Sequence, residues 1–446
     1  MTTTLAHFER QIPIRHEVDI LVVGGGPAGV AAAVTAARLG AKVYLVEATS
    51  CFGGMGTLGL VPCFMQFADG VHFLADGIGR EIHDRLWQAG GTGPDDRPDE
   101  RFGHLAIRSE VLKTVYDDLV SEAGVQFSFQ TQLIAVEQIG GEVKLAICAA
   151  KSGLFAIRAQ VFIDCSGDGD LCAWAGAPFG KGDATGNMMP GTLCSLWADI
   201  DWDTVKHASQ NPEEILPSVF ERGIFTNHDR HLPGMWWVGV HLGGGNIGHA
   251  FGVDATDEES VTRALVQGRK TVREYERFYK QYMNGYQNME LVATGALLGI
   301  RESRRILGDY VLNLDDFKRR AVFTDEIGRY SYPVDIHAAR PDDALFAQFS
   351  EEIRTLRYAP GESYGIPYRS LIPQQLVNVL VAGRCISSDR YIQGSLRVMP
   401  GCYITGQATG AAGTLALNCQ AVTRGVNPAE LQKTLKGLGA YLPNAE

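Results

Sequence analysis

The chain has 446 residues, which at roughly 150 residues per domain predicts two or three structural units. Apolar residues make up 45% and charged residues 20% of the chain, a globular composition that excludes intrinsically disordered and collagen-like proteins. The 51 acidic residues outnumber the 40 basic ones and give a formal charge of -11. This balance argues against nucleic acid as the main partner, because duplex binding needs basic surfaces.

The N-terminal segment, residues 1–15, is polar and mixed and lacks the basic and apolar regions of a signal peptide. We therefore expect a cytoplasmic protein. The nine cysteines are scattered and form no Cys-x-x-Cys pair, which favours free thiols over a disulfide framework or a metal site.

A strand, a glycine-rich turn, a helix and a second strand follow one another near the N-terminus. The apolar patterns predict strands over residues 18–23 and 42–46 and an Ala-rich helix over residues 30–39. The turn, residues 24–29, has the sequence GGGPAG, and Glu47 follows the second strand. This is a complete βαβ unit with the fingerprint of a dinucleotide-binding protein.

Each position in this unit has a physical reason. Gly24 permits the tight turn, Gly26 lets the backbone approach a pyrophosphate at the helix N-terminus, and Gly29 allows the helix to pack closely on the strand. Glu47 can accept hydrogen bonds from a ribose diol. The sequence therefore predicts a dinucleotide site here.

Glycine loops follow other predicted strands. Residues 51–57 form a loop that either lies along a cofactor or is a surface turn. Further strands are predicted over residues 125–136, 142–148, 160–164 and 377–382. The strand at 160–164 enters the sequence CSGDGD, and the last strand enters Gly383. Such junctions are typical of places where backbone meets a ligand.

The middle of the chain has a different pattern. Residues 243–248 match GxGxxG a second time, but no Ala-rich helix follows, so a hairpin turn between strands is predicted. A strand is predicted over residues 235–242, and a capping box at residues 256–259 opens a helix that reaches residue 282. Strands and helices do not alternate here, which favours an antiparallel sheet with helices in an inserted domain.

A last uncharged segment, residues 398–423, resembles a membrane span only in lacking charge. It contains Gln407, Asn418, Gln420 and several threonines and has few large apolar residues. A buried helix is predicted there, and no membrane association.

Taken together, these motifs resemble the FAD-dependent oxidoreductases of the glutathione-reductase-like flavoprotein group, within their broad, largely uncharacterised FAD-oxidoreductase branch. The residues that carry the resemblance are 22–29 (VVGGGPAG) with Glu47, 53–57 (GGMGT), 162–170 (FIDCSGDGD), 299–305 (GIRESRR), 364–369 (YGIPYR), 381–384 (VAGR) and 406–410 (GQATG). They follow the order of that family over nearly the whole chain, which is specific for fold and cofactor but not for substrate.

The resemblance implies an α/β fold class with a Rossmann-like FAD-binding domain and an inserted α+β substrate domain. The implied boundaries are residues 14–185 for the first part of the FAD-binding domain, 186–363 for the inserted domain, 364–425 for the returning segment and 426–446 for a C-terminal tail.

The resemblance also implies residue roles around FAD. The pyrophosphate would lie on Gly24, Gly26, Pro27, Ala28 and Gly29, the adenosine ribose on Glu47 and the adenine on the backbone of Leu133. Gly54 and Met55 would run past the ribityl and flavin region, Ser166 and Gly167 would lie at the second crossover, and Gly383 would meet the ribityl-phosphate arm. A helix N-terminus near Thr405 and Gly406 would point at flavin N1 and O2, where its positive end stabilises reduced flavin.

Two departures narrow the chemistry. Disulfide reductases of this group carry a cysteine pair after the ribose acid, whereas Cys51 stands alone before Gly53, so thiol–disulfide exchange is disfavoured. The Trp-x-Trp-x-Ile-Pro motif of flavin-dependent halogenases is absent from residues 235–238 (MWWV), so halogenation is disfavoured.

Several side chains are candidates for catalysis. Arg301 and Arg305 are four residues apart and share a face in either a helix or a strand, so they would clamp a carboxylate substrate. The alternative is a structural salt-bridge cluster with Glu302, Asp309, Asp315 or Asp316. Arg397 precedes the predicted flavin-facing helix and would neutralise reduced flavin.

Acid–base candidates complete the set. Tyr368 and His337 are possible acid or base groups, with packing residues as the alternative, and His241 and His249 are weaker candidates. Cys51 either attaches flavin covalently or is a buried thiol.

The predicted function is an FAD-dependent oxidoreductase that transfers a hydride between a small organic substrate and flavin N5. The alternatives are an NAD(P)H-using flavin monooxygenase, since some such enzymes bind NADPH without a second fingerprint, and a non-catalytic binding protein on the same fold. Neither the electron acceptor nor the oligomeric state follows from the sequence.

Overall fold

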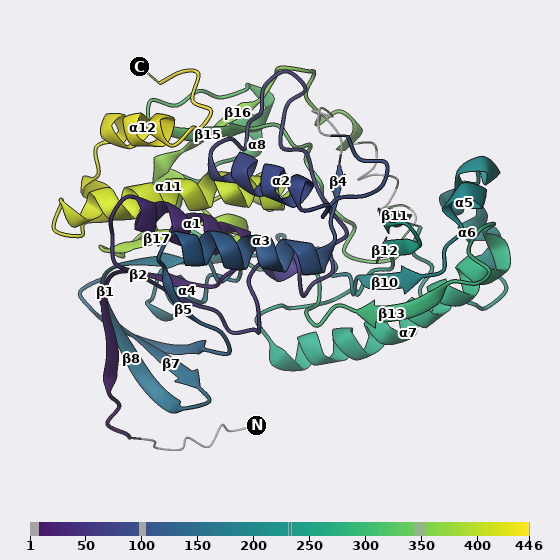
Figure 1. Cartoon of the computed structure of the whole chain (residues 1–446), viewed down its shortest axis with the longest axis horizontal. Helices are drawn as coiled ribbons and strands as arrows, with labels where there is room; N and C mark the ends of the chain where they lie inside the picture. Colours follow the sequence, from purple (N-terminus) through teal and green to yellow (C-terminus); the bar gives the residue numbers. More distant parts are fainter. Residues whose placement is uncertain are drawn as a thin grey trace.

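The structure is a computed structural model that describes residues 9–97 and 104–445, apart from residues 231, 233, 343, 345, 346, 348–350 and 352. The expectation for residues 1–15 therefore lies partly outside the described residues. Helices, strands and the chain ends are drawn in Figure 1.

A mixed sheet forms the centre of the fold. Its strands are β1 (Ile14–Val23), β2 (Val43–Val46), β5 (Gln126–Ser128), β6 (Gln132–Ile139), β7 (Glu142–Ala150), β8 (Gly153–Asp164) and β17 (Val379–Val381). They lie in the order β5-β2-β1-β8-β7-β6, and β17 pairs with β8 off this path. The pairs of β1 with β2 and β8, of β2 with β5 and of β17 with β8 are parallel, whereas β6, β7 and β8 form an antiparallel meander. The predicted α/β fold class is confirmed.

The last four residues of the central strand β1, residues 20–23, are buried on both faces, which explains their unbroken apolar run. Ile20 and Val22 belong to the core shared with α1 (Pro27–Arg38), α2 (Ile78–Gln88), α3 (Ser109–Glu122) and α11 (Met399–Leu417). Leu21 and Val23 point the other way, into a second core with β6, β7 and α4 (Asp170–Trp174). Figure 1 shows α1, α3 and α11 together on one side of the sheet.

A second sheet lies apart from the first in Figure 1 and is antiparallel, as predicted. It contains β10 (Ser195–Ala198), β11 (Gly234–Gly239), β12 (Leu242–Asn246) and β13 (Glu290–Thr294), in the order β11-β12-β10-β13. Its aromatic core is shared with α5 (Trp202–Ala208), α6 (Pro212–Phe220) and the long helix α7 (Glu258–Tyr282).

Three local predictions about these elements are wrong in detail. The first three glycines of the second GxGxxG match, residues 243–245, lie within β12 and not in the hairpin turn. A Cβ on Gly243 would lie 2.4 Å from Ile200 and one on Gly244 2.4 Å from Pro62, so close packing requires glycine at both positions. The N-cap of α7 is Asp257, whose side chain accepts from the Ser260 N–H, and not the first residue of the predicted capping box. The strand predicted over residues 125–136 is divided between β5 and β6.

Shorter elements connect these sheets. The paired strands are β3 (Cys63–Phe64) with β4 (Leu105–Ala106), β9 (Phe179–Lys181) with β14 (Arg304–Ile306), and β15 (Glu326–Tyr330) with β16 (Tyr364–Pro367). The short helices are η1 (Gly54–Gly56), α8 (Leu314–Lys318), η2 (Tyr368–Leu371), η3 (Gly383–Cys385), α10 (Arg390–Leu396), η4 (Thr423–Gly425) and α12 (Pro428–Gly437).

The uncharged segment near the C-terminus forms α11, which is buried along most of its length and contacts α1, as predicted for a buried helix. Its neighbour α12 places Leu431 and Leu435 in the same core. No helix within the described residues has the length and apolar character needed to cross a membrane.

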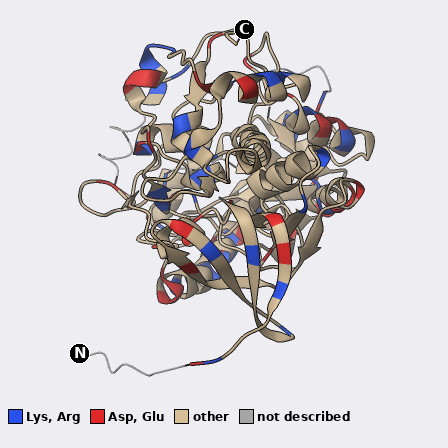
Figure 2. Cartoon of the chain, turned by 90° about the vertical axis from the view of Figure 1, so that its left-hand side faces the viewer, with Lys and Arg blue, Asp and Glu red and all other residues tan. Residues whose placement is uncertain are grey.

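In Figure 2, acidic and basic residues are interspersed on the side that faces the viewer.

Candidate functional site

The site is a cavity of about 660 Å³ that begins at the turn between β1 and α1. Gly24 has a φ of +94°, and a Cβ there would lie 2.5 Å from the Cys165 carbonyl oxygen, so only glycine fits this turn. Gly26 is the N-cap of α1, and no side chain caps the helix. Gly24, Gly26, Pro27 and Ala28 line the cavity. The predicted cradle therefore lies at the cavity wall.

Glu47 follows β2 and also lines the cavity. Its Oε2 accepts from the Gly25 N–H at 2.6 Å and its Oε1 from the Thr49 N–H at 2.7 Å. These backbone bonds fix the carboxylate beside the glycine turn, while each oxygen keeps a lone pair for a further donor. This is the position in which a ribose-binding acid is required.

The other predicted cofactor residues come from elements far apart in sequence. Gly54 and Met55 of η1, Leu133 of β6, Ser166 and Gly167 after β8, and Gly383 of η3 all line the same cavity. The turn after β8 is held by Asp164, which accepts from the Ser166 N–H and hydroxyl and from the Cys172 N–H. The fold thus gathers these segments around one space.

Three predicted cofactor residues lie elsewhere. Gly29 does not line the cavity; a Cβ there would lie 1.8 Å from the Gly24 carbonyl oxygen, so this glycine serves helix–strand packing. The helix N-terminus expected near Thr405 and Gly406 is wrong, because α11 begins at Met399 and Val398 is its N-cap. Val398 and Met399 line the cavity in their place.

Thr405 and Gly406 instead connect α11 to neighbouring segments of the fold. The Thr405 Oγ1 accepts from the Gly383 N–H at 3.1 Å. A Cβ on Gly406 would lie 2.2 Å from the Ala28 carbonyl oxygen, so this glycine allows α11 to approach α1. Thr405 therefore supports the cavity wall through a hydrogen bond, and Gly406 supports it through helix packing.

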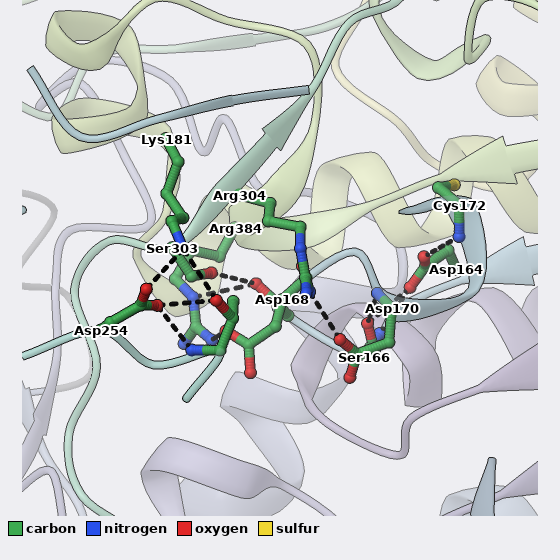
Figure 3. Close-up of polar contacts among 12 residues, drawn as sticks. Asp164, Ser166, Asp168, Asp170, Cys172, Lys181, Asp254, Ser303, Arg304 and Arg384 are labelled. Carbon is green, nitrogen blue, oxygen red and sulfur yellow. Dashed lines mark hydrogen bonds and ion pairs between the residues drawn. The ribbon is translucent and has the colours of Figure 1, made fainter. Parts of the chain in front are cut away.

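A polar junction supports the turn after β8, and Figure 3 shows its side chains. Arg384 donates to Asp168 Oδ1 at 2.6 Å and to the Gly167 carbonyl at 3.0 Å. Arg304 donates to Asp170 Oδ1 at 2.7 Å. Lys181 and Asp254 pair beside them, which ties β9 to the loop before α7. These contacts fix the cavity wall where the two predicted domains meet.

The other end of the cavity carries a buried polar cluster of Arg301, Asp335, His337 and Arg397. Arg397 Nη2 donates to Asp335 Oδ2 at 2.6 Å, and His337 Nε2 lies 3.1 Å from Asp335 Oδ1. Burial acts to raise the pKa of the Asp335 carboxyl, but His337, Arg397 and Arg301 outweigh it and hold that pKa well below its usual value. Asp335 is therefore an anion at neutral pH.

Arg301 is buried at this end, with 8% of the residue exposed. Its Nη1 donates to the Pro190 carbonyl at 2.9 Å and to Thr192 Oγ1 at 2.8 Å. Burial lowers the pKa of Arg301 to about 10, and the neighbouring Arg397 contributes in the same direction. The guanidinium is still protonated at neutral pH.

The sequence analysis ranked His249, which contacts this cluster, too low, and it missed Asp335 and Tyr332 altogether. His249 Nε2 lies 3.1 Å from His337 Nδ1, and His249 Nδ1 lies 2.9 Å from Asp229 Oδ2. Tyr332 lines the cavity, and burial raises the pKa of its phenol. His249 lies 88 positions from His337, so long-range packing alone brings these two side chains together.

Two predicted catalytic residues do not reach the cavity. Arg305 Nη1 donates to Glu302 Oε1 at 2.6 Å, and its Nη2 donates to the Gly182 carbonyl. Arg305 therefore forms a structural ion pair with Glu302, which is the alternative to substrate binding given above. The prediction that Arg301 and Arg305 share one face is wrong, because β14 begins only at Arg304 and does not include Arg301. Tyr368 is buried, and its hydroxyl donates to the Thr423 carbonyl at 2.8 Å.

Cys51 is also outside the cavity lining. Its thiol contacts Thr57, and burial raises the pKa of the thiol. A buried, protonated thiol is unreactive. Cys51 therefore has the environment of a packing residue.

The cavity passes a simple test for FAD. A Cβ added at Gly26 would meet no atom within 4 Å, so the protein leaves open space at the point where a pyrophosphate approaches the backbone. The start of α1, the bound Glu47 carboxylate and the start of α11 all face this one cavity. Fold and site together define a dinucleotide-binding α/β protein.

Comparison with known proteins places the chain more narrowly. Residues 19–435 match the model of a family described as FAD dependent oxidoreductase. The protein belongs to this FAD-dependent oxidoreductase family, and it is an enzyme that uses FAD. Its placement within the glutathione-reductase-like group stays a prediction.

Individual relatives are distant. The chain is 28% identical over 243 residues to a thiamine thiazole synthase of Methanococcus vannielii, covering 51% of this chain and 84% of the relative. It is 49% identical over 47 residues to a dihydrolipoyl dehydrogenase of Trypanosoma brucei brucei, covering 10% of each.

Similar solved structures share little sequence. A geranylgeranyl bacteriochlorophyll reductase-like protein of Thermoplasma acidophilum has a TM-score of 0.46 and 14% identity, with 95% of this chain and 83% of that chain covered. A p-nitrophenol 4-monooxygenase of Pseudomonas putida has a TM-score of 0.47 and 10% identity, with 94% and 84% covered.

Proposed function

We propose that this enzyme transfers a hydride between a small organic substrate and FAD. One observation carries the proposal: the cavity that is lined by the glycine turn and Glu47 is also lined by Arg301, Asp335, His337 and Arg397. A cofactor cradle and a buried polar cluster in one space suit a reaction in which substrate and cofactor lie side by side.

The chain's own residues divide the work. Gly24, Gly26, Pro27 and Ala28 would hold the pyrophosphate of FAD, and Glu47 the adenosine ribose. Bound FAD supplies the hydride acceptor or donor at its N5 atom. Arg397 and the uncapped start of α11 place positive charge at the polar end of the cavity, where negative charge on reduced flavin would be stabilised.

The proton that accompanies the hydride has a partner in the same cluster. As the substrate C–H bond breaks, its hydrogen leaves with both bonding electrons as a hydride to FAD, and the proton of the adjoining O–H or N–H group passes to the pair formed by His337 Nε2 and Asp335 Oδ1. The contact of His337 with His249 holds the ring in place. In the reducing direction the same pair returns the proton.

An anaerobic screen tests this proposal. The holoenzyme is mixed with small alcohols, amines and acids without oxygen, and a substrate is recognised by bleaching of the flavin absorbance. His337→Gln should retain FAD and bleach about 10²- to 10⁴-fold more slowly, the range of general acid–base catalysis. The matched control, His207→Gln, changes an exposed histidine of α5 and should bleach at the parent rate.

Two results would overturn the proposal. Bleaching of His337→Gln at the parent rate would remove His337 from the proton transfer. NADPH consumption tied to oxygen uptake and a hydroxylated product would replace hydride transfer from the substrate with monooxygenase chemistry.

A further inference from the structure

Of the arginines that line the cavity, all but one have a carboxylate partner. Asp168 pairs with Arg384 at 2.6 Å and Asp170 with Arg304 at 2.7 Å. Glu47 binds backbone N–H groups at the nucleotide end. At the polar end, Asp335 is shared between Arg397 and His337.

Arg301 is the exception. Within the part of the chain that the structure describes, no carboxylate lies within ion-pair distance of its guanidinium, and its hydrogen-bond acceptors are all neutral. The nearby Asp229 contacts His249 at 2.9 Å. The polar end thus holds a buried positive charge without a direct counter-ion, which is costly unless an anion arrives.

The donors of Arg301 are used unevenly. Both N–H groups of Nη1 are engaged by Pro190 and Thr192. Nη2 makes only a 3.5 Å contact with Asn246 Oδ1, and Nε has no hydrogen bond to a described residue. The Nε–Nη2 edge, which receives a carboxylate through two parallel hydrogen bonds, is therefore left over.

A neighbouring amide and a second positive charge lie near this edge. The side-chain nitrogen of Asn246, which also lines the cavity, makes no hydrogen bond to a described residue. Arg397 lines the same cavity, and its positive charge acts on Arg301. Donors outnumber acceptors around Arg301, which is the composition of a site for an acceptor-only group.

We propose that the substrate of this enzyme is a carboxylate and that the Nε–Nη2 edge of Arg301 binds its carboxylate group, with Asn246 beside it. The inference rests on the proposed hydride transfer and names its substrate class. A carboxylate held at Arg301 would lie in the same polar cluster as His337 and Asp335. The predicted clamp by two arginines is thus replaced by Arg301 acting without Arg305.

Binding to the oxidised holoenzyme tests this inference without turnover. Acetate and benzoate are titrated beside their neutral isosteres, acetamide and benzamide, and the change in flavin absorbance reports binding. The parent should bind the carboxylates and not the amides. Arg301→Gln should weaken carboxylate binding by about 30-fold or more, the loss expected for one partner of a buried charge pair.

Two further variants keep the test decisive. Arg301→Lys keeps the charge but has no bidentate edge, and should bind carboxylates about 10-fold more weakly than the parent. This variant also serves if Arg301→Gln does not fold. Arg305→Gln is the matched control, because Arg305 pairs with Glu302 outside the cavity while Arg390 still pairs with Glu302.

Three outcomes would overturn the inference. They are equal binding of acids and amides by the parent, parent-like carboxylate binding by Arg301→Gln with an unchanged flavin reduction potential, and parent-like binding by that variant with a lowered flavin reduction potential. The last result would assign the guanidinium to the cofactor. None of them depends on the substrate screen, so failure here and failure of the proposed hydride transfer remain distinguishable.

Discussion

Arg397 Nη2 lies 2.6 Å from Asp335 Oδ2, and this ion pair joins the residue before the N-cap of α11 to the segment that follows β15. The same carboxylate contacts His337 through its other oxygen. One aspartate therefore positions both the arginine at the start of α11 and the candidate acid–base histidine.

The ion pair predicts a pH dependence of stability. The pKa of Asp335 is lowered in the folded protein, so the unfolded chain binds more protons and the carboxylate stabilises the fold above its ordinary pKa of about 3.9. This contribution is lost as the pH falls from there toward the folded pKa. Urea unfolding at a series of acidic pH values gives the slope of the free energy of unfolding against pH. This slope should be shallower in Asp335→Asn than in the parent, by up to the equivalent of about one proton.

The matched control for that series is Asp118→Asn, which changes an exposed aspartate of α3. A slope for Asp335→Asn equal to that of the parent would show that this carboxyl has the same pKa in both states.

Gly26→Val should remove FAD without unfolding the protein. The glycine has an ordinary φ of -67°, and a Cβ there meets no protein atom within 4 Å, so the added side chain occupies only the space predicted for the pyrophosphate. Flavin absorbance per protein should fall to near zero, and thermal unfolding should match that of the FAD-free parent. A variant as yellow as the parent would place the pyrophosphate elsewhere.

Gly406→Ala should act on stability. Its Cβ would lie 2.2 Å from the Ala28 carbonyl oxygen, so α1 and α11 must move apart, at a cost of about 1–3 kcal/mol in the free energy of unfolding. Gly437→Ala in α12 meets nothing within 4 Å and should gain about 0.4–1 kcal/mol. Denaturant unfolding of both variants checks the opposite signs; equal effects would refute the packing role of Gly406.

Tyr368→Phe should leave FAD content and flavin bleaching unchanged. It removes only the bond from the Tyr368 hydroxyl to the Thr423 carbonyl, and should cost about 1–2 kcal/mol in the free energy of unfolding. Slower bleaching in a variant that retains FAD would instead show that Tyr368 takes part in catalysis.

The sequence was most informative where structure is local. The turn at Gly24 and Gly26 and the acid Glu47 belong to one βαβ unit, so strand and helix periodicity placed all three at the cavity wall. The antiparallel sheet around β12 was predicted for a similar reason, although tight packing placed its glycines in a strand and not in a turn.

The sequence was least informative where distant segments meet. A regular helix or strand through residues 301–305 would place Arg301 and Arg305 on one face. The strand β14 begins only at Arg304, however, and the two arginines bind different partners. The helix start was placed at Thr405 although α11 begins at Met399. The approach of His249 to His337 spans 88 positions, and no periodicity encodes it. The domain boundaries and the predicted lack of nucleic-acid partners stay predictions.

The central claim is that one cavity holds FAD at its glycine turn and the reacting end of FAD beside His337 and Arg397. A crystal structure of the FAD-bound enzyme tests it most directly. We predict the pyrophosphate at Gly26, the ribose at Glu47 and the isoalloxazine ring in contact with the cluster of Arg301, Asp335, His337 and Arg397. A ring that lies away from this cluster would contradict the account.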